Sequence, residues 1–125
     1  MSKERLHLGK RGEELAVAFL KEKGYEIIAR NYKTRFGEID IIARDKDTLC
    51  FVEVKTRRTQ KFGLPQEALV SFKQRQIAKS ALSFLQERAL LEKKARFDVV
   101  AITYSKDKAE RNLIKDAFEL DAHFS

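Results

Sequence analysis

The stretch Arg35–Arg58, RFGEIDIIARDKDTLCFVEVKTRR, consists of two apolar runs joined by a polar turn. Each run carries an acid where its neighbours predict burial: Asp40 stands among isoleucines, and Glu53 stands between Val52 and Val54. Burying an ionised carboxylate is costly unless the charge is paired. The stretch therefore predicts a β-hairpin whose two acids share a compensating partner.

The expected turn sets the register of this hairpin. If the chain reverses at Lys46–Asp47 in a two-residue turn, Asp40 lies opposite Glu53. Glu38 then lies opposite Lys55 on the same face of the sheet. Directly opposed residues have Cβ atoms about 4.5–5.5 Å apart, so the two carboxylates can converge on one divalent cation. A lysine beside them is suited to orient an attacking water or to stabilise charge on a phosphate.

An acid in one strand followed after a hairpin by Glu-x-Lys resembles the motif of the PD-(D/E)xK nuclease superfamily. Here the motif is Asp40 with Glu53-Val54-Lys55, and Ile39 stands where the superfamily often has proline. The chain as a whole resembles the YraN family of small bacterial proteins, itself similar to archaeal Holliday-junction resolvases. The residues that carry this wider resemblance are Gly12-Glu13, Asn31, Gly37 to Ile42, Phe51 to Lys55, Arg57, Lys73, Arg96 to Val99 and Ala117-Phe118.

The resemblance implies a metal-dependent endonuclease acting on structured or branched DNA, with Mg²⁺ or Mn²⁺ as cofactor. Asp40 and Glu53 would hold the metal together with the backbone carbonyl of Val54, and Lys55 would position the hydrolytic water. A glutamate on the first helix is a recurrent third acid of resolvase-like sites, which assigns Glu13 to the metal directly or through water. The spacing of Glu13 alone fits a solvated acid near a helix start equally well.

Basic residues near the motif are candidates for nucleic-acid contacts. Arg57, Arg58 and Lys61 belong to a segment that we expect to be a loop at the mouth of the site, where they would contact phosphates or simply be solvated. Lys73 falls within the apolar stripe of a predicted helix. Its place in the matched pattern makes it a supporting site residue, with Gln74 as neighbour, although such lysines often lie at the rim of a core.

The rest of the chain predicts an α/β fold. We expect a helix at Leu8–Lys23, a strand at Tyr25–Asn31, the hairpin, and a helix from Pro65 to about Lys94 with a break near Ser71. Strands at Phe97–Tyr104 and Leu113–Phe118 follow, separated by a charged turn. Asp98 reads as a structural acid, paired with Arg96 or with an amide at the end of the sheet, rather than as a metal ligand. This order predicts a mixed sheet flanked by helices, and the resemblance specifies a restriction-endonuclease-like sandwich.

Length and composition restrict the remaining possibilities. The 125 residues predict a single domain, and the net charge of +7, from 26 basic and 19 acidic residues, favours a polyanionic partner such as DNA. The sequence contains no run of 18 apolar residues, so we expect no membrane-spanning helix. The first residues lack the apolar region of a secretory signal. The single cysteine, Cys50, is typical of a reducing compartment, so we expect a cytoplasmic protein.

Two other functions remain open: a non-catalytic DNA-binding module of the same fold, and an RNA-processing nuclease. A homodimer is a further hypothesis, because the resolvases that the chain resembles act as symmetric dimers. The candidate contacts are Phe62, Leu64 and the apolar C-terminal strand, each of which fits a position in the core equally well.

Overall fold

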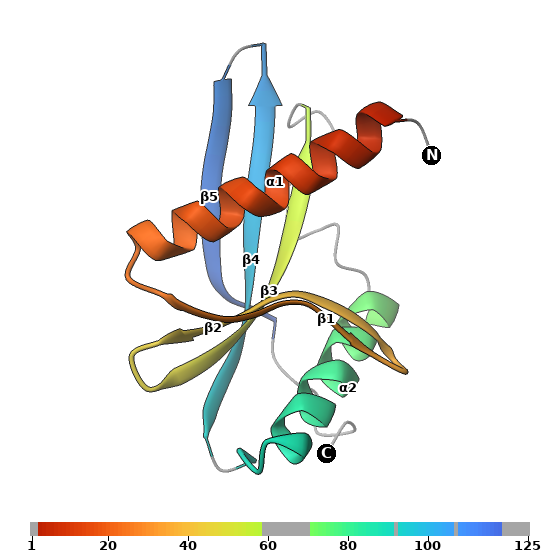
Figure 1. Cartoon of the computed structure of the whole chain (residues 1–125), viewed down its shortest axis with the longest axis vertical. Helices are drawn as coiled ribbons and strands as arrows, with labels where there is room; N and C mark the ends of the chain where they lie inside the picture. The colour runs from red at the N-terminus through yellow and green to blue at the C-terminus, as the bar shows by residue number, and fades with distance from the viewer. Residues whose placement is uncertain (1–2, 59–70, 92, 107, 119–125) are drawn as a thin grey trace.

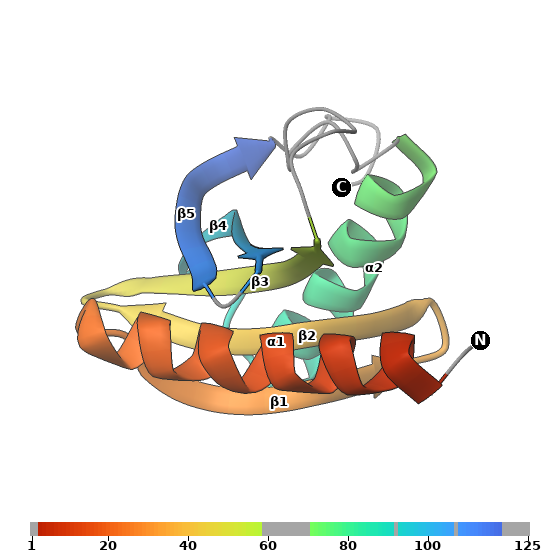
Figure 2. The same cartoon turned by 90° about the horizontal axis from the view of Figure 1, so that it is seen from above.

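The computed structural model describes residues 3–58, 71–91, 93–106 and 108–118. Within these residues the elements are, in chain order, α1 (Lys3–Glu22), β1 (Glu26–Thr34), β2 (Gly37–Asp45), β3 (Thr48–Arg57), α2 (Ser71–Glu87), β4 (Lys94–Ser105) and β5 (Lys108–Phe118). The strands form one sheet in the order β1-β2-β3-β4-β5. Figures 1 and 2 show the two helices against this twisted sheet.

The sheet is mixed, as the sequence predicts. Strands β1, β2 and β3 are joined as antiparallel neighbours, whereas β3 and β4 run parallel and are connected through α2. Strand β5 returns antiparallel along β4. Among the described residues, no helix is long and apolar enough to cross a membrane.

Each face of the sheet has its own apolar core. Buried side chains of α1, including Ala16 and Leu20, pack on Ile41 and other residues of one face. Buried side chains of α2 pack on the opposite face, where both Ile39 and Ile42 contribute. Residues three apart in a regular strand point to opposite faces. Strand β2 is therefore irregular between these two isoleucines, which is where Asp40 lies.

The predicted hairpin turn is confirmed, but several element boundaries differ from the predictions. Asp45 pairs with Thr48, and Lys46 adopts a φ of 59° in the turn. Helix α1 begins before Leu8, and α2 ends at Glu87, so the helix predicted to reach Lys94 is too long. After α2, Ala89 adopts a φ of 55°, a left-handed conformation that does not continue a helix. The predicted residues 65–70 lie outside the described residues.

The charged segment before the last strand is not a long turn. Strand β5 already begins at Lys108, and Ser105 pairs with Lys108 across a tight reversal. Residues 108–112 are exposed at the edge of the sheet. Charged residues are characteristic of edge strands because they disfavour pairing with another chain. This explains why the composition resembled a turn.

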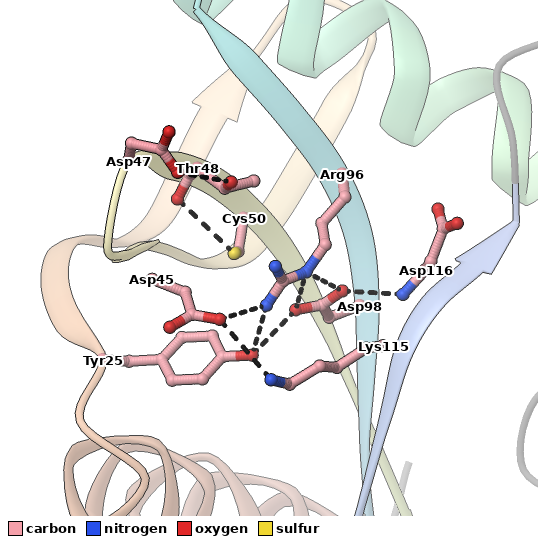
Figure 3. A network of polar contacts seen from close by, with 9 residues as sticks. All are labelled: Tyr25, Asp45, Asp47, Thr48, Cys50, Arg96, Asp98, Lys115 and Asp116. Atoms are coloured by element: carbon pink, nitrogen blue, oxygen red, sulfur yellow. Dashed lines mark hydrogen bonds and ion pairs between the residues drawn. The ribbon is translucent and has the colours of Figure 1, made fainter.

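A buried polar network holds together the end of the sheet near the β2–β3 turn (Figure 3). Asp98 is fully buried, and its two carboxylate oxygens accept bonds from Arg96 Nε at 3.0 and 3.1 Å. The Asp116 backbone N–H donates to Asp98 Oδ1 at 2.9 Å, and the Tyr25 hydroxyl donates to Oδ2 at 3.2 Å. Arg96 Nη2 also donates to Asp45 Oδ2 at 2.7 Å. Asp98 is thus a structural acid paired with Arg96, as the sequence predicts.

Candidate functional site

The acids of the motif lie where β2 and β3 stop pairing regularly. The antiparallel ladder runs from Asp45–Thr48 to Ile41–Val52 and ends there. In the predicted register, Asp40 would face Glu53 one residue pair beyond that end, and Glu38 would face Lys55 three pairs beyond it. The ladder does not extend to either pair.

Beyond this point a side chain of β2, rather than its backbone, accepts a hydrogen bond from β3. The backbone N–H of Val54 in β3 donates to Asp40 Oδ2 at 2.8 Å. The Asp40 carboxylate thereby occupies a place that a backbone carbonyl would have in a continued ladder. It is fixed between the two strands.

The Asp40 carboxyl titrates far from its usual range. Burial raises its pKa, and the charge of Glu53 raises it further, to about 7. The bond from the Val54 N–H acts in the opposite direction, and Glu13 adds to the upward shift. The two motif acids are therefore close enough to influence each other, as the hairpin predicts.

Glu53 is a buried acid with one partnered oxygen. Its side chain is 6% exposed, and Oε1 lies 3.3 Å from Lys73 Nζ. Within the described part of the chain, Oε2 is buried without a hydrogen-bond partner. Burial raises the Glu53 pKa, and the ammonium groups of Lys73 and Lys55 oppose that shift. A buried carboxylate oxygen without a donor costs free energy, and a cation is one group that can satisfy it.

Glu13 approaches the site from α1, where the helix lies close to the sheet. Gly12 is buried, and a Cβ atom at this position would lie 2.4 Å from Thr56 Oγ1, so a larger residue would require Thr56 or the helix to shift. Asn31 Nδ2 donates to both carboxylate oxygens of Glu13, at 3.4 and 3.2 Å. Glu13 is near enough to Asp40 to raise its pKa, but it is oriented by Asn31.

Asn31 lies in the site, although the sequence analysis assigns it no role there. Its neighbours Arg30 and Tyr32 pair with Ile41 and Ile39, which sets Asn31 across from Asp40. Its φ of 50° is left-handed, a conformation that asparagine adopts more readily than most residues. Two features of the sequence therefore pointed to this position: its asparagine tolerates a left-handed backbone, and it belongs to the pattern that carries the family resemblance.

The other residues predicted for the site differ in burial and in their place in the fold. Lys55 and Gln74 are half-buried on β3 and α2, and Arg57 is half-buried at the end of β3, with exposed Arg58 directly after it. Lys61, Phe62 and Leu64 lie outside the described residues. The carbonyl of Val54 stays a predicted ligand.

The acids fit a hard cation, but as a partial ligand set. Among the described residues, no three histidine, cysteine, aspartate or glutamate side chains are grouped so that they could hold a metal ion. Carboxylate oxygens are the ligands that Mg²⁺ and Mn²⁺ prefer, and Mg²⁺ usually retains several waters beside one or two carboxylates. The unpartnered oxygen of Glu53 and the charge coupling with Asp40 suit such a cation.

The fold and the site together define a mixed α/β protein in which half-buried Asp40 lies near buried Glu53, with Lys55 and Lys73 beside Glu53. The chain belongs to the family described as "Uncharacterised protein family UPF0102", whose model matches residues 12–102. That range includes Glu13, Asp40, Glu53, Lys55 and Lys73.

Relatives of similar length support this assignment. A UPF0102 protein of Syntrophus aciditrophicus is 54% identical over 117 residues, covering 94% of this chain and 92% of the relative. A UPF0102 protein of Geobacter sulfurreducens is 55% identical over 114 residues, covering 90% and 89%. One of Caldicellulosiruptor saccharolyticus is 48% identical over 113 residues, covering 89% and 96%.

Proposed function

We propose that the protein is a divalent-metal-dependent endonuclease of the PD-(D/E)xK type that acts on structured or branched DNA. The observation that carries this proposal is the pair formed by half-buried Asp40 and buried Glu53: the charge of Glu53 raises the Asp40 pKa, and Glu53 Oε2 has no hydrogen-bond partner in the described part of the chain. The mixed sheet with its parallel β3–β4 pair is compatible with a restriction-endonuclease-like fold. A cytoplasmic location is part of the same proposal.

Each residue of the site would have a separate role. A bound Mg²⁺ or Mn²⁺ ion would supply Lewis-acid stabilisation of the phosphate and a more acidic water. Asp40 and Glu53 would hold the ion with the Val54 carbonyl, and the Val54 N–H keeps the Asp40 carboxylate oriented. Lys55 would position the hydrolytic water.

Two further residues would adjust the charge of the site. Lys73 already neutralises part of the Glu53 charge, so it would stabilise the site before the cation binds. Glu13, held by Asn31, would contact the ion directly or through water.

Nucleic-acid binding would rest on phosphate contacts. The net charge of +7 favours a polyanion, and Arg57, Arg58 and Lys61 follow the Glu53–Lys55 motif in the chain. These contacts would orient the substrate without selecting its sequence.

A non-catalytic DNA-binding module is the second candidate. The observation that favours it is the Lys73–Glu53 ion pair together with the lack of a three-acid cluster in the described ranges. In that function the lysine, and no metal, would compensate the buried acid.

Cleavage of a labelled four-way DNA junction distinguishes the two functions. The full chain is incubated with the junction, with duplex DNA and with RNA of the same sequence, in Mg²⁺, in Mn²⁺ or in a chelator. We expect metal-dependent cleavage of the junction that Glu53→Gln and Lys55→Met abolish and that the exposed-acid control Glu110→Gln retains. Junction binding without cleavage in either metal would favour the module, and preferential RNA cleavage would favour an RNA-processing nuclease.

A further inference from the structure

A second feature lies where the turn between β1 and β2 meets α2, which are neighbours in Figure 1. A hollow of about 310 Å³ opens there. Its volume is at the lower end of the range usual for small-ligand sites, roughly 300–1,000 Å³. The residues that line it are Arg35, Phe36, Arg75, Gln76 and Lys79.

The turn that forms one wall of the hollow is fixed to the helix. The Thr34 and Ser80 hydroxyl oxygens lie 2.8 Å apart in a hydrogen bond. The Phe36 N–H donates to Thr34 Oγ1 at 3.0 Å, which sets the position of Phe36 in the turn. Next to it, Gly37 lies so close to α2 that a Cβ atom there would be 3.8 Å from Gln76 Cβ. The wall is therefore preorganised by contacts within the fold.

The chemistry of the hollow combines positive charge with an aromatic ring. Arg35 Cζ lies 4.7 Å and Lys79 Nζ lies 5.7 Å from the centroid of the half-buried Phe36 ring. Within the ranges that the structure describes, Arg35, Arg75 and Lys79 form no ion pair with an acid. Three cations without an acidic partner in those ranges favour an anionic ligand, and the part of the half-buried Phe36 ring that stays exposed favours a planar group that can stack.

The hollow lies close to the candidate metal site along α2. Gln76 is three residues after Lys73, so the two occupy adjacent positions on the helix surface. Lys73 is the residue that pairs with Glu53. A strand of nucleic acid that reached the acids would therefore pass near the hollow.

We propose that this hollow binds an unpaired nucleotide of the nucleic-acid substrate. The base would stack on Phe36, and the adjoining phosphates would contact Arg35, Arg75 and Lys79. A nucleotide combines a planar base with a phosphate anion, the two features that this lining favours. The proposal rests on the proposed function, and it deepens it by naming the substrate feature that is recognised: a base outside a continuous duplex.

Binding measured in a chelator tests the proposal separately from cleavage. The probes are a DNA duplex with a central single-stranded gap that carries 2-aminopurine and the same duplex fully paired. The variants are Phe36→Ala, Phe36→Leu, which keeps apolar bulk without a ring, and Arg75→Gln/Lys79→Gln. The charge-matched control is Lys21→Gln/Lys108→Gln, two exposed lysines of α1 and β5. Circular dichroism verifies that each variant is folded.

We expect the parent to change the 2-aminopurine fluorescence and both Phe36 variants to abolish that change. Their affinity for the gapped duplex should fall about 5- to 150-fold, the range for loss of one stacked base, with little effect on the paired duplex. The Arg75/Lys79 variant should bind the gapped duplex more weakly than its charge-matched control.

Retention by Phe36→Leu of parental affinity and fluorescence would overturn the proposal, as would competition by free adenosine monophosphate at the affinity of the gapped duplex. Either result leaves the proposed nuclease activity untouched, because that activity is read from metal-dependent cleavage. Stacking without any cleavage would support the nucleotide site and contradict the nuclease.

Discussion

At the scale of single residues, the Asp40 carboxyl is an acid whose pKa folding raises into the neutral range. Its pKa rises from 3.8 to about 7, chiefly through burial and secondly through the charge of Glu53. Between these pH values the folded chain binds more protons than the unfolded chain. Stability of the metal-free protein should therefore fall as the pH rises from about 4 to 7, and this loss should be complete above pH 7.

The substitution Asp40→Asn should remove part of that pH dependence, because asparagine keeps an oxygen for the Val54 N–H but cannot ionise. At pH 8 in a chelator we expect the variant to be more stable than the parent by roughly 1–3 kcal/mol. Urea unfolding at a series of pH values measures the effect. Asp47→Asn, at an exposed acid, is the control and should leave the slope between pH 5 and 8 unchanged. An unaltered slope in Asp40→Asn would show that this carboxyl is not strained by burial.

At the scale of elements, the approach of α1 to β3 depends on the absence of a side chain at Gly12. A methyl group there would overlap Thr56 Oγ1, so we expect Gly12→Ala to destabilise the fold by about 1–3 kcal/mol. The matched control is Gly9→Ala in the same helix, where a Cβ meets nothing within 4 Å and should stabilise the helix by up to about 1 kcal/mol. Thermal unfolding of both variants measures the difference.

Rescue identifies the cause of the Gly12→Ala effect. If overlap with Thr56 is responsible, adding Thr56→Ala should recover part of the lost stability. A Gly12→Ala variant as stable as Gly9→Ala would mean that α1 does not lie this close to β3.

The elements also show which features of the fold could be predicted from the sequence alone. The hairpin turn at Lys46–Asp47 and its register were predictable, because the turn and the alternating apolar residues agree. The end of the ladder at Ile41–Val52 was not, since it depends on a side chain, Asp40, replacing a backbone acceptor. Strand β5 was predicted too short because an exposed edge strand has the composition of a turn.

The site shows the same limit. The closeness of the Asp40 and Glu53 carboxylates, seen in the effect of Glu53 on the Asp40 pKa, follows from the hairpin. By contrast, the contacts of Lys73 with Glu53 and of Asn31 with Glu13 join segments that are distant in sequence, so only the packing of both helices on the sheet defines them.

At the scale of the whole molecule, we propose that the chain acts as a homodimer, because a branched substrate has two strands to cut and each chain offers one candidate site. A two-fold arrangement would join two basic surfaces into one track. Light scattering at micromolar concentration should give twice the mass of one chain without DNA, and the mass of two chains plus one junction when a four-way junction is bound. A monomer in both conditions would rule out the dimer and leave two explanations, nicking of single strands or the need for a partner protein.

The central claim is that Asp40 and Glu53 together hold one divalent cation, and calorimetric titration with Mn²⁺ tests it most directly. We expect the parent to bind about one ion per chain, and to bind it more tightly at pH 8 than at pH 6 because the carboxylates must lose their protons first. The Asp40→Asn/Glu53→Gln double variant should give no such binding, whereas the exposed-acid control Glu26→Gln/Glu110→Gln should match the parent. Equal Mn²⁺ binding by the parent and the Asp40/Glu53 double variant would contradict the account.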